Sequence, residues 1–343
     1  MRSIESGVVW RGSFAGAICG FVSAFGVEFA DQFRFAGPSS FWQQLPFYLI
    51  SFGVGAIATV LEITFILWDG TRSALRIGEV AQVLDVQESV ELERMELSLV
   101  RAGLDVPAPR TPWRGIDPLL GSSRWQILFV ALLYKLKIAG TSVIVKGLFG
   151  KISARLSGRI LSRSVVELAA VPVFALWNAY ICSRVMREAR VRALGPSLTE
   201  ELLKRAFPNG FESLDRDLQR ACIACVRDQI IIAKCRHPNL IRMGHMLFVC
   251  SRFVTFDEIG EFTVFSALEN ALPPQKKIIL EFFLIITVLD GKLSSKDCRM
   301  INRLALVAGM DSKNTVKRAK IYAKAILMGN PLNLGAKHIF CFE

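Results

Sequence analysis

Two long apolar runs lie close together at the start of the chain, and they limit its fold more than any other feature. The first covers residues 8–30 and the second residues 45–67, which Trp42 and Trp68 bracket. A bilayer core of about 30 Å is crossed by roughly 20 mostly apolar helical residues, and aromatic side chains favour its two interfaces. Only a short polar turn separates the runs. The sequence therefore predicts an integral membrane protein with a transmembrane hairpin over residues 1–68.

Small residues recur at four-residue spacing along the first run and share one helical face. They are Gly12, Gly16, Gly20 and Ala24. In lipid, such a face lets another helix backbone approach closely. It predicts a helix-packing seam, either with the second run, which carries Gly53 and Gly55, or with another copy of the protein in a homo-oligomer.

A second membrane hairpin is expected over residues 125–190, but its pattern is less regular. Lys135 and Lys137 interrupt its first segment, and its second segment, 165–186, contains Glu167. A charged side chain at mid-bilayer costs at least about 2.5–3.5 kcal/mol on insertion scales. The region is therefore either two further spans or an embedded hairpin that does not span, and hydropathy favours the former, giving four spans in all.

A basic stripe lies between the two segments of this second hairpin. Its members are Lys151, Arg155, Arg159 and Arg163, all on one helical face. An apolar face accompanies it, which is typical of an amphipathic helix at a membrane surface. The stripe indicates binding to anionic lipid headgroups, and an ordinary solvated face is the alternative.

Ionisable residues inside the apolar segments form another candidate set. Glu62 lies in the second half of the second run, and Lys135, Lys137 and Glu167 lie in the second hairpin. Such groups are costly in a membrane and often line a transport pathway. A pair between Glu62 and either lysine would neutralise both charges. The set therefore indicates either a permeation or proton pathway, or a single ion pair that helps helix packing.

Basic residues follow both hairpins and predict the topology. Arg72 and Arg76 follow the first hairpin, and four arginines lie within residues 184–192 after the second. Loops rich in Lys and Arg face the cytoplasm. We therefore expect a multi-pass protein of the bacterial inner membrane with both termini cytoplasmic, whichever number of spans holds.

Residues 69–124 should form a cytosolic helix followed by a linker. Apolar residues recur at helical spacing after residue 73, and an acidic stretch with Glu88, Glu91, Glu93 and Glu96 follows. A Pro-rich stretch then covers residues 106–118. We expect one long helix that extends the second span, with an acidic face that is either solvated or docked on the basic C-terminal half.

After Gly195-Pro196 the pattern changes to that of a soluble all-α domain over residues 195–330, followed by a tail at 331–343. Three capping boxes indicate helix starts, because in each the two side chains can satisfy free amides. They pair Ser197 with Glu200, Thr255 with Glu258, and Ser294 with Asp297. The expected helices are 197–207, 212–234, 238–252, 256–271, 275–289, 295–308 and 312–327. The very apolar run 278–289 is too short to span a membrane and should be the central helix of a bundle.

One part of this domain resembles a known family. Residues 285–310 end one helix on Asp290-Gly291, continue through Ser294 and Asp297, and close a second helix on Ala308-Gly309. This pattern is similar to the helical repeat of tellurite-resistance TerB-like domains, and the resemblance covers about 275–327. It implies a small all-α bundle whose acidic residues, here Asp290 and Asp297, hold a divalent metal. No second Asp-Gly motif is present and the surroundings are basic, so we expect no metal.

Four residues of zinc-binding types occur close together in the sequence. They are Cys222, Cys225, Cys235 and His237, and a C-x2-C pair is common in zinc sites. Cys222 and Cys225 lie in an apolar helical run, where cysteine also fits as a small core residue. Core packing is the favoured interpretation, and no cofactor is expected.

Motifs of catalysis and nucleic-acid binding are absent from the sequence. The chain has no HExxH, Walker loop, Gly-rich dinucleotide turn or GxSxG motif. Residues 184–343 carry 25 Lys and Arg against 16 Asp and Glu, but without interleaved aromatic residues. We therefore expect no enzyme and no nucleic-acid partner, and attribute the basic charge to attraction toward anionic lipid.

These observations together predict a membrane-anchored, non-enzymatic scaffold or interaction protein. The N-terminal helices would anchor it in the bilayer, and the cytosolic helical domain would bind an unknown protein partner in an envelope-related or stress-related setting. The alternative is a small channel or transporter that uses Glu62 with Lys135 or Lys137.

Overall fold

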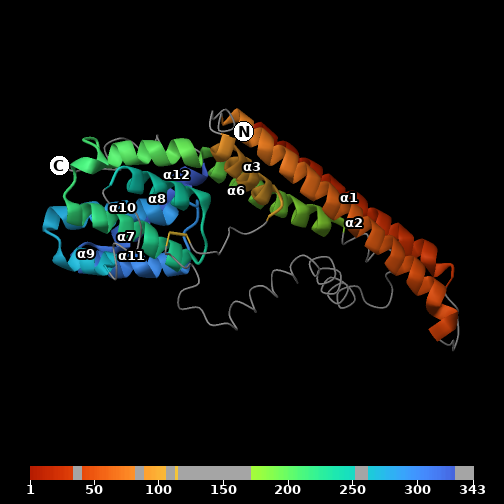
Figure 1. The fold of residues 1–343 in the computed structure, drawn as a ribbon. Coiled ribbons are helices and arrows are strands. Elements are labelled where there is room, and N and C mark those ends of the chain that lie inside the picture. The colour runs from red at the N-terminus through yellow and green to blue at the C-terminus, as the bar shows by residue number, and fades with distance from the viewer. Residues whose placement is uncertain (34–40, 82–88, 106–112, 115–170, 252–261, 329–343) are drawn as a thin grey trace. The chain divides into compact units, whose positions relative to one another are not determined.

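The structure is a computed structural model, and it describes residues 1–33, 41–81, 89–105, 113–114, 171–251 and 262–328 (Figure 1). Within these ranges the regular elements are ten α-helices and one short 3-10 helix, with no β-strand. The all-α fold class is therefore confirmed for the described part of the chain. The basic stripe, Lys135, Lys137, Glu167, the expected Thr255 cap and most of the Pro-rich stretch lie outside it.

The chain divides into two compact units. The first comprises residues 1–73 and 122–186, and the second comprises residues 74–121 and 187–343. The second unit includes residues 74–121, which lie between the two predicted hairpins, and residues 187–194, which precede the helical domain expected from the sequence.

The first unit contains two long apolar helices, α1 (Arg2–Asp31) and most of α2 (Phe41–Val80). Both are long and apolar enough to cross a membrane. Two contacts show that they pack antiparallel. Arg11 of α1 binds Asp69 near the end of α2, and Gly26, later in α1, lies against Val54, earlier in α2. The two contacts are 15 residues apart on each helix, so the helices are paired over about 22 Å.

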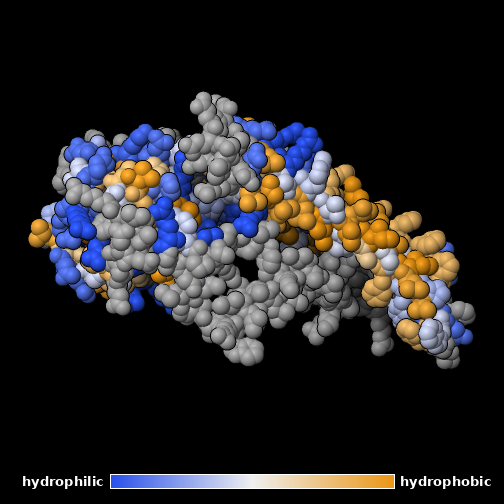
Figure 2. All heavy atoms as spheres, in the orientation of Figure 1, coloured by the Kyte–Doolittle hydropathy of each residue, from blue (hydrophilic) through white to orange (hydrophobic). Residues whose placement is uncertain are grey.

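Large apolar side chains cover the outward faces of these two helices. The most exposed include Trp10, Phe14, Phe21 and Phe25 on α1 and Trp42, Phe52, Val60 and Leu61 on α2. Figure 2 shows this hydrophobic surface over α1 and α2. Contiguous apolar surface of this extent is rare on soluble monomers and marks contact with a membrane or another protein.

The second unit is a helical bundle built around α10 (Pro273–Val288). Residues 279–288 of this helix are all buried, as expected for the central helix. The helices around it are α7 (Arg216–Ala233), α8 (Pro238–Val249), α9 (Val264–Asn270), α11 (Ser295–Val307) and α12 (Ser312–Leu327), with a 3-10 turn at Phe211–Ser213. Their limits agree closely with most of the predicted helices. Ser294 caps α11 with Asp297 in the predicted box, its hydroxyl accepting from the Asp297 amide at 3.2 Å.

Two predicted helix boundaries are wrong. No helix starts at Ser197, because α6 runs without a break from Val171 to Ala206 and contains Pro196. A proline inside a helix costs about 3 kcal/mol. Buried apolar residues on both sides of it, including Ala193 and Leu198, hold the helix together and outweigh that cost.

The second wrong boundary concerns the helix expected to extend the second apolar run. α2 does continue beyond the run, to Val80, but Glu91, Glu93 and Glu96 belong to a separate helix, α3 (Ser89–Gly103). Glu88 lies outside the described residues. α3 is held in the second unit by its own apolar residues, since Leu99 and Ala102 are almost fully buried.

Candidate functional site

The small-residue seam of α1 faces the start of α6 in the same chain. Gly12, Gly16, Gly20 and Ala24 are all buried. A Cβ at Gly12 would collide with Cys182, and a Cβ at Gly16 would lie 2.8 Å from the carbonyl oxygen of Phe174. The seam thus permits close helix contact, but with α6, which was not among the two partners considered from the sequence. A Cβ added at Gly53 of the second run would meet no atom within 4 Å.

Two polar contacts lie along the same helices. Asn178 of α6 is buried, and its Nδ2 donates to Oε1 of Glu62 on α2 at 2.5 Å. Arg11 of α1 donates from Nε to both carboxylate oxygens of Asp69 at 3.1 Å, and from Nη2 to Oδ1 at 2.9 Å. Glu62 therefore has a buried amide partner that the sequence did not identify. The lysines predicted to neutralise it lie outside the described residues.

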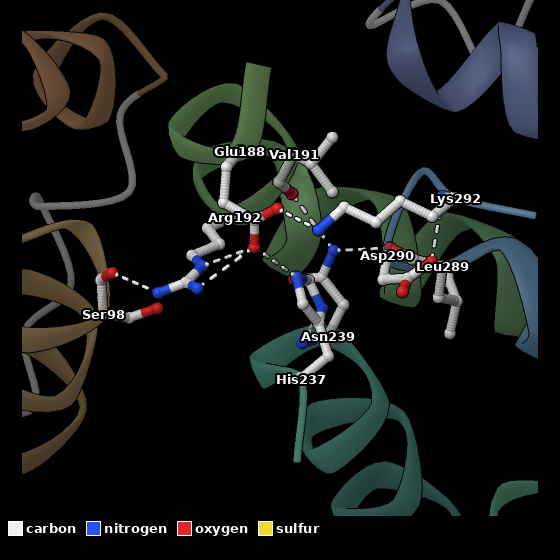
Figure 3. Close-up of polar contacts among 9 residues, drawn as sticks. All are labelled: Ser98, Glu188, Val191, Arg192, His237, Asn239, Leu289, Asp290 and Lys292. Atoms are coloured by element: carbon white, nitrogen blue, oxygen red, sulfur yellow. Dashed lines mark hydrogen bonds and ion pairs between the residues drawn. The ribbon is translucent and has the colours of Figure 1, made fainter. Parts of the chain in front are cut away.

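A polar cluster in the second unit centres on Glu188 of α6 (Figure 3). Its carboxylate accepts from Nε of Arg192 at 3.0 Å and from Nζ of Lys292 at 2.7 Å. Nε2 of His237 lies 3.3 Å from Oε1 of the same carboxylate. One carboxylate thus contacts two cations and an imidazole, which come from α6, the turn before α8 and the turn after α10.

The environment of Glu188 favours its charged form. Burial alone would raise the pKa of its carboxyl group, but the contacts with His237, Lys292 and Arg192 outweigh burial and hold the pKa well below its usual value. Nδ1 of His237 accepts from the Asn239 amide at 3.4 Å, and Nε2 is the ring nitrogen that faces Glu188.

Backbone carbonyls complete the cluster. Nη1 of Arg192, whose side chain is 4% exposed, donates to the carbonyl oxygen of Ser98 in α3 at 2.7 Å. Nδ2 of Asn239 donates to the carbonyls of Val191 at 3.0 Å and Leu289 at 2.9 Å. The cluster therefore links α3, α6, α8 and the end of α10, and its polar atoms serve to join helices.

The four candidate zinc ligands are not gathered into one site. Cys222 and Cys225 lie on α7 with no exposed surface, and burial raises the pKa of each thiol. His237 instead caps α8 and faces Glu188. In the described part of the chain, no group of three or more His, Cys, Asp and Glu residues is arranged to hold a metal ion.

The two acidic residues of the TerB-like pattern lie in structural contacts. Asp297 accepts from the Ser294 amide at 2.7 Å and from Nε2 of Gln229 at 3.1 Å. Asp290 accepts from the Lys292 amide at 2.9 Å, and burial raises the pKa of its carboxyl group. Asp297 thus caps α11 and ties it to α7, whereas Asp290 stabilises the turn between α10 and α11.

Sequence reasoning did not find the Glu188 cluster. The i, i+4 spacing of Glu188 and Arg192 was visible, but such pairs are common on exposed helix faces. The contacts with Lys292 and Ser98 span 104 and 94 residues, so no local pattern carries them.

Comparisons with protein-family models, with curated proteins and with solved structures give no match to this chain.

Proposed function

We propose that this protein is a membrane-anchored, non-enzymatic scaffold of the bacterial inner membrane, with both termini cytoplasmic. In this proposal α1, α2 and the start of α6 lie in the bilayer, and the helical bundle of the second unit binds a protein partner. The TerB-like pattern at 275–327 favours an envelope-related or stress-related role.

The exposed apolar faces of α1 and α2 carry the membrane part of the proposal. Side chains such as Phe14 and Phe52 are 66% and 72% exposed, which is unfavourable in water and favourable in lipid. Trp42 and Trp68 are 26 residues apart on α2, or about 39 Å along a helix, which matches a bilayer with its interfaces. Arg72 lies with its guanidinium carbon 5.4 Å from the Trp68 ring centre, as suits an interface.

The arrangement of polar groups in the bundle supports a scaffold. Glu188 and Asp297 are bound by side chains and amides that connect helices, and Glu281 of α10 is paired with Arg318 of α12. These carboxylates stabilise the bundle, because each one contacts side chains or amides of the same domain. A rigid helical domain of this kind is suited to presenting a binding surface.

Fractionation tests the anchor directly. Membranes from cells that produce the full chain are washed with alkaline carbonate, which releases peripheral proteins. The chain should remain in the membrane, and cysteine-labelling reagents that do not cross the membrane should fail to reach engineered cysteines at residues 3 and 314 in intact cells. Release by carbonate, or labelling from outside, would refute the proposal. A specific partner that crosslinks to the bundle in cells would support the scaffold function.

A small channel or transporter is the second candidate, and the buried Asn178 bound to Glu62 favours it. A carboxylate and an amide in contact between apolar helices could bind a cation or a proton. Lys135 and Lys137 would belong to the same pathway. Ion and proton flux is measured in proteoliposomes with the wild-type chain, Glu62→Gln, and Glu200→Gln as an exposed control. Flux that only Glu62→Gln abolishes would favour the channel, whereas absence of flux in all three would favour the scaffold.

A further inference from the structure

The last helix of the bundle, α12, has one strongly basic face. Lys313, Lys317, Lys320 and Lys324 are all exposed, and at 100° per residue they fall within an arc of about 60°. The buried residues of the helix, which include Thr315, Ala319, Tyr322, Ala323 and Ile326, lie on the opposite side. We call the four lysines the α12 lysine face. It points away from the core and extends for about 17 Å along the helix.

The charge of this face is not balanced locally. α12 contains no Asp or Glu, and in the described part of the chain none of the four ammonium groups forms an ion pair. Elsewhere in the same unit, cations have carboxylates one turn away, as in Lys204 with Glu200 and Arg192 with Glu188. Four like charges at this spacing repel one another, which destabilises the helix slightly unless an anionic surface lies against it.

An exposed aliphatic side chain lies on one flank of the lysine face. On α12 itself, Ile321 is 47% exposed and lies about 40° from the nearest lysine of the face. Lysines beside an exposed aliphatic side chain are the composition of helices that lie at a lipid surface.

We propose that the α12 lysine face docks on the anionic phospholipid headgroups of the membrane that holds α1 and α2. The inference deepens the proposed function, since it requires the first unit to be in the bilayer. α6 runs from the first unit into the second, so the chain itself tethers the lysine face to the anchored helices and the docking step is intramolecular. Each lysine close to an anionic leaflet favours the docked state by roughly fivefold, so four act together strongly.

Lipid fits this face better than nucleic acid does. The exposed residues of α12 include no aromatic side chain for base stacking, since its single tyrosine, Tyr322, is buried. All four cations are lysines, which act as hydrated point charges and lack the forked geometry with which arginine binds phosphate or guanine. Diffuse attraction to a charged plane is the interaction such a face supports.

Lysine acetylation followed by mass spectrometry tests the docking on the full chain. The protein is placed in nanodiscs of phosphatidylcholine alone, or of equal parts phosphatidylcholine and phosphatidylglycerol. Acetylation of the four lysines should slow by roughly fivefold or more in the anionic discs. Lys204, whose side chain is 71% exposed, is the internal reference and should react equally in both. In 1 M salt, where the screening length falls to about 3 Å, the protection should disappear.

A matched pair of variants makes the test specific. Ile321→Asp places a carboxylate within one turn of Lys317 and Lys324, and it should restore rapid acetylation of the remaining face in anionic discs. Val249→Asp adds the same charge at an exposed apolar position of α8 and should leave the protection intact. Unchanged protection in Ile321→Asp would overturn the proposal.

Other outcomes separate this proposal from the proposed function. Incorporation into discs with equal acetylation in both compositions overturns docking and leaves the membrane anchor standing. A chain that does not enter discs refutes the anchor and, with it, the docking, which requires the first unit to be in the bilayer. Protection by a single-stranded RNA, without protection by anionic discs, would also overturn it.

Discussion

Glu188→Gln should destabilise the second unit by about 2–3 kcal/mol. Removing one partner from a buried ion pair costs about 3–5 kcal/mol, because the remaining charge is left without compensation. Here Arg192 is the remaining buried charge, whereas Lys292 is 60% exposed and can be solvated. Gln also keeps the shape of the side chain and part of its hydrogen bonding, so we expect a value below the full range.

The same substitution has a defined pH dependence. The folded-state pKa of Glu188 lies below its ordinary value of about 4.5, so the unfolded state binds more protons in this range. The stabilising contribution is therefore complete above about pH 4.5 and is lost as the pH falls toward the folded-state pKa. The difference in stability between wild type and Glu188→Gln should shrink as the pH falls below about 5.

Hydrogen exchange of the full chain in detergent micelles provides the measurement. Peptides from α7 and α10, which form the core of the unit, report the free energy of its global opening. Glu200→Gln is the control, because Glu200 and Lys204 form an exposed i, i+4 pair, which contributes little to stability. A loss for Glu188→Gln no larger than that of the control, or a difference that does not change with pH, would refute the assigned role.

Three further predictions concern packing. Gly16→Leu should destabilise the first unit by about 1–3 kcal/mol by overpacking the seam, whereas Gly53→Leu, at an open position, should not; thermal unfolding in micelles compares them. Tyr322→Phe removes a hydroxyl that contacts a buried carboxylate and should cost about 1–2 kcal/mol by hydrogen exchange. Cys222 should react with maleimide far more slowly than Cys298 in the folded chain, since burial suppresses its thiolate, and equal rates measured by mass spectrometry would contradict the packing.

Much of the fold could be predicted from local signals. The limits of α11 follow from the Ser294 capping box and from Gly309, which has a φ of 73° just after the helix. The length of the apolar run predicted α10 as the central helix. These features are local, because a helix cap and an apolar run each depend on residues only a few positions apart in the sequence.

The features that were missed depend on distant residues. The glycine pattern of α1 shows that another helix can approach closely, but not which helix, since any backbone fits such a face. The continuity of α6 through Pro196 depends on burial on both sides, and the proline alone predicts a helix boundary. The candidate sites also could not be predicted from local sequence, because the partners of Glu62 and Glu188 lie far away along the chain.

The shared helix α6 has a consequence for how this chain can vary in length. Asn178 and Glu188 lie on the same uninterrupted helix, one in each unit. Within the second unit, Glu188 pairs with Arg192 one turn later on this helix. Inserting a single residue between Glu188 and Arg192 would turn one side chain by about 100° around the helix relative to the other and separate the pair. Homologous chains should therefore conserve the four-residue spacing of these two positions.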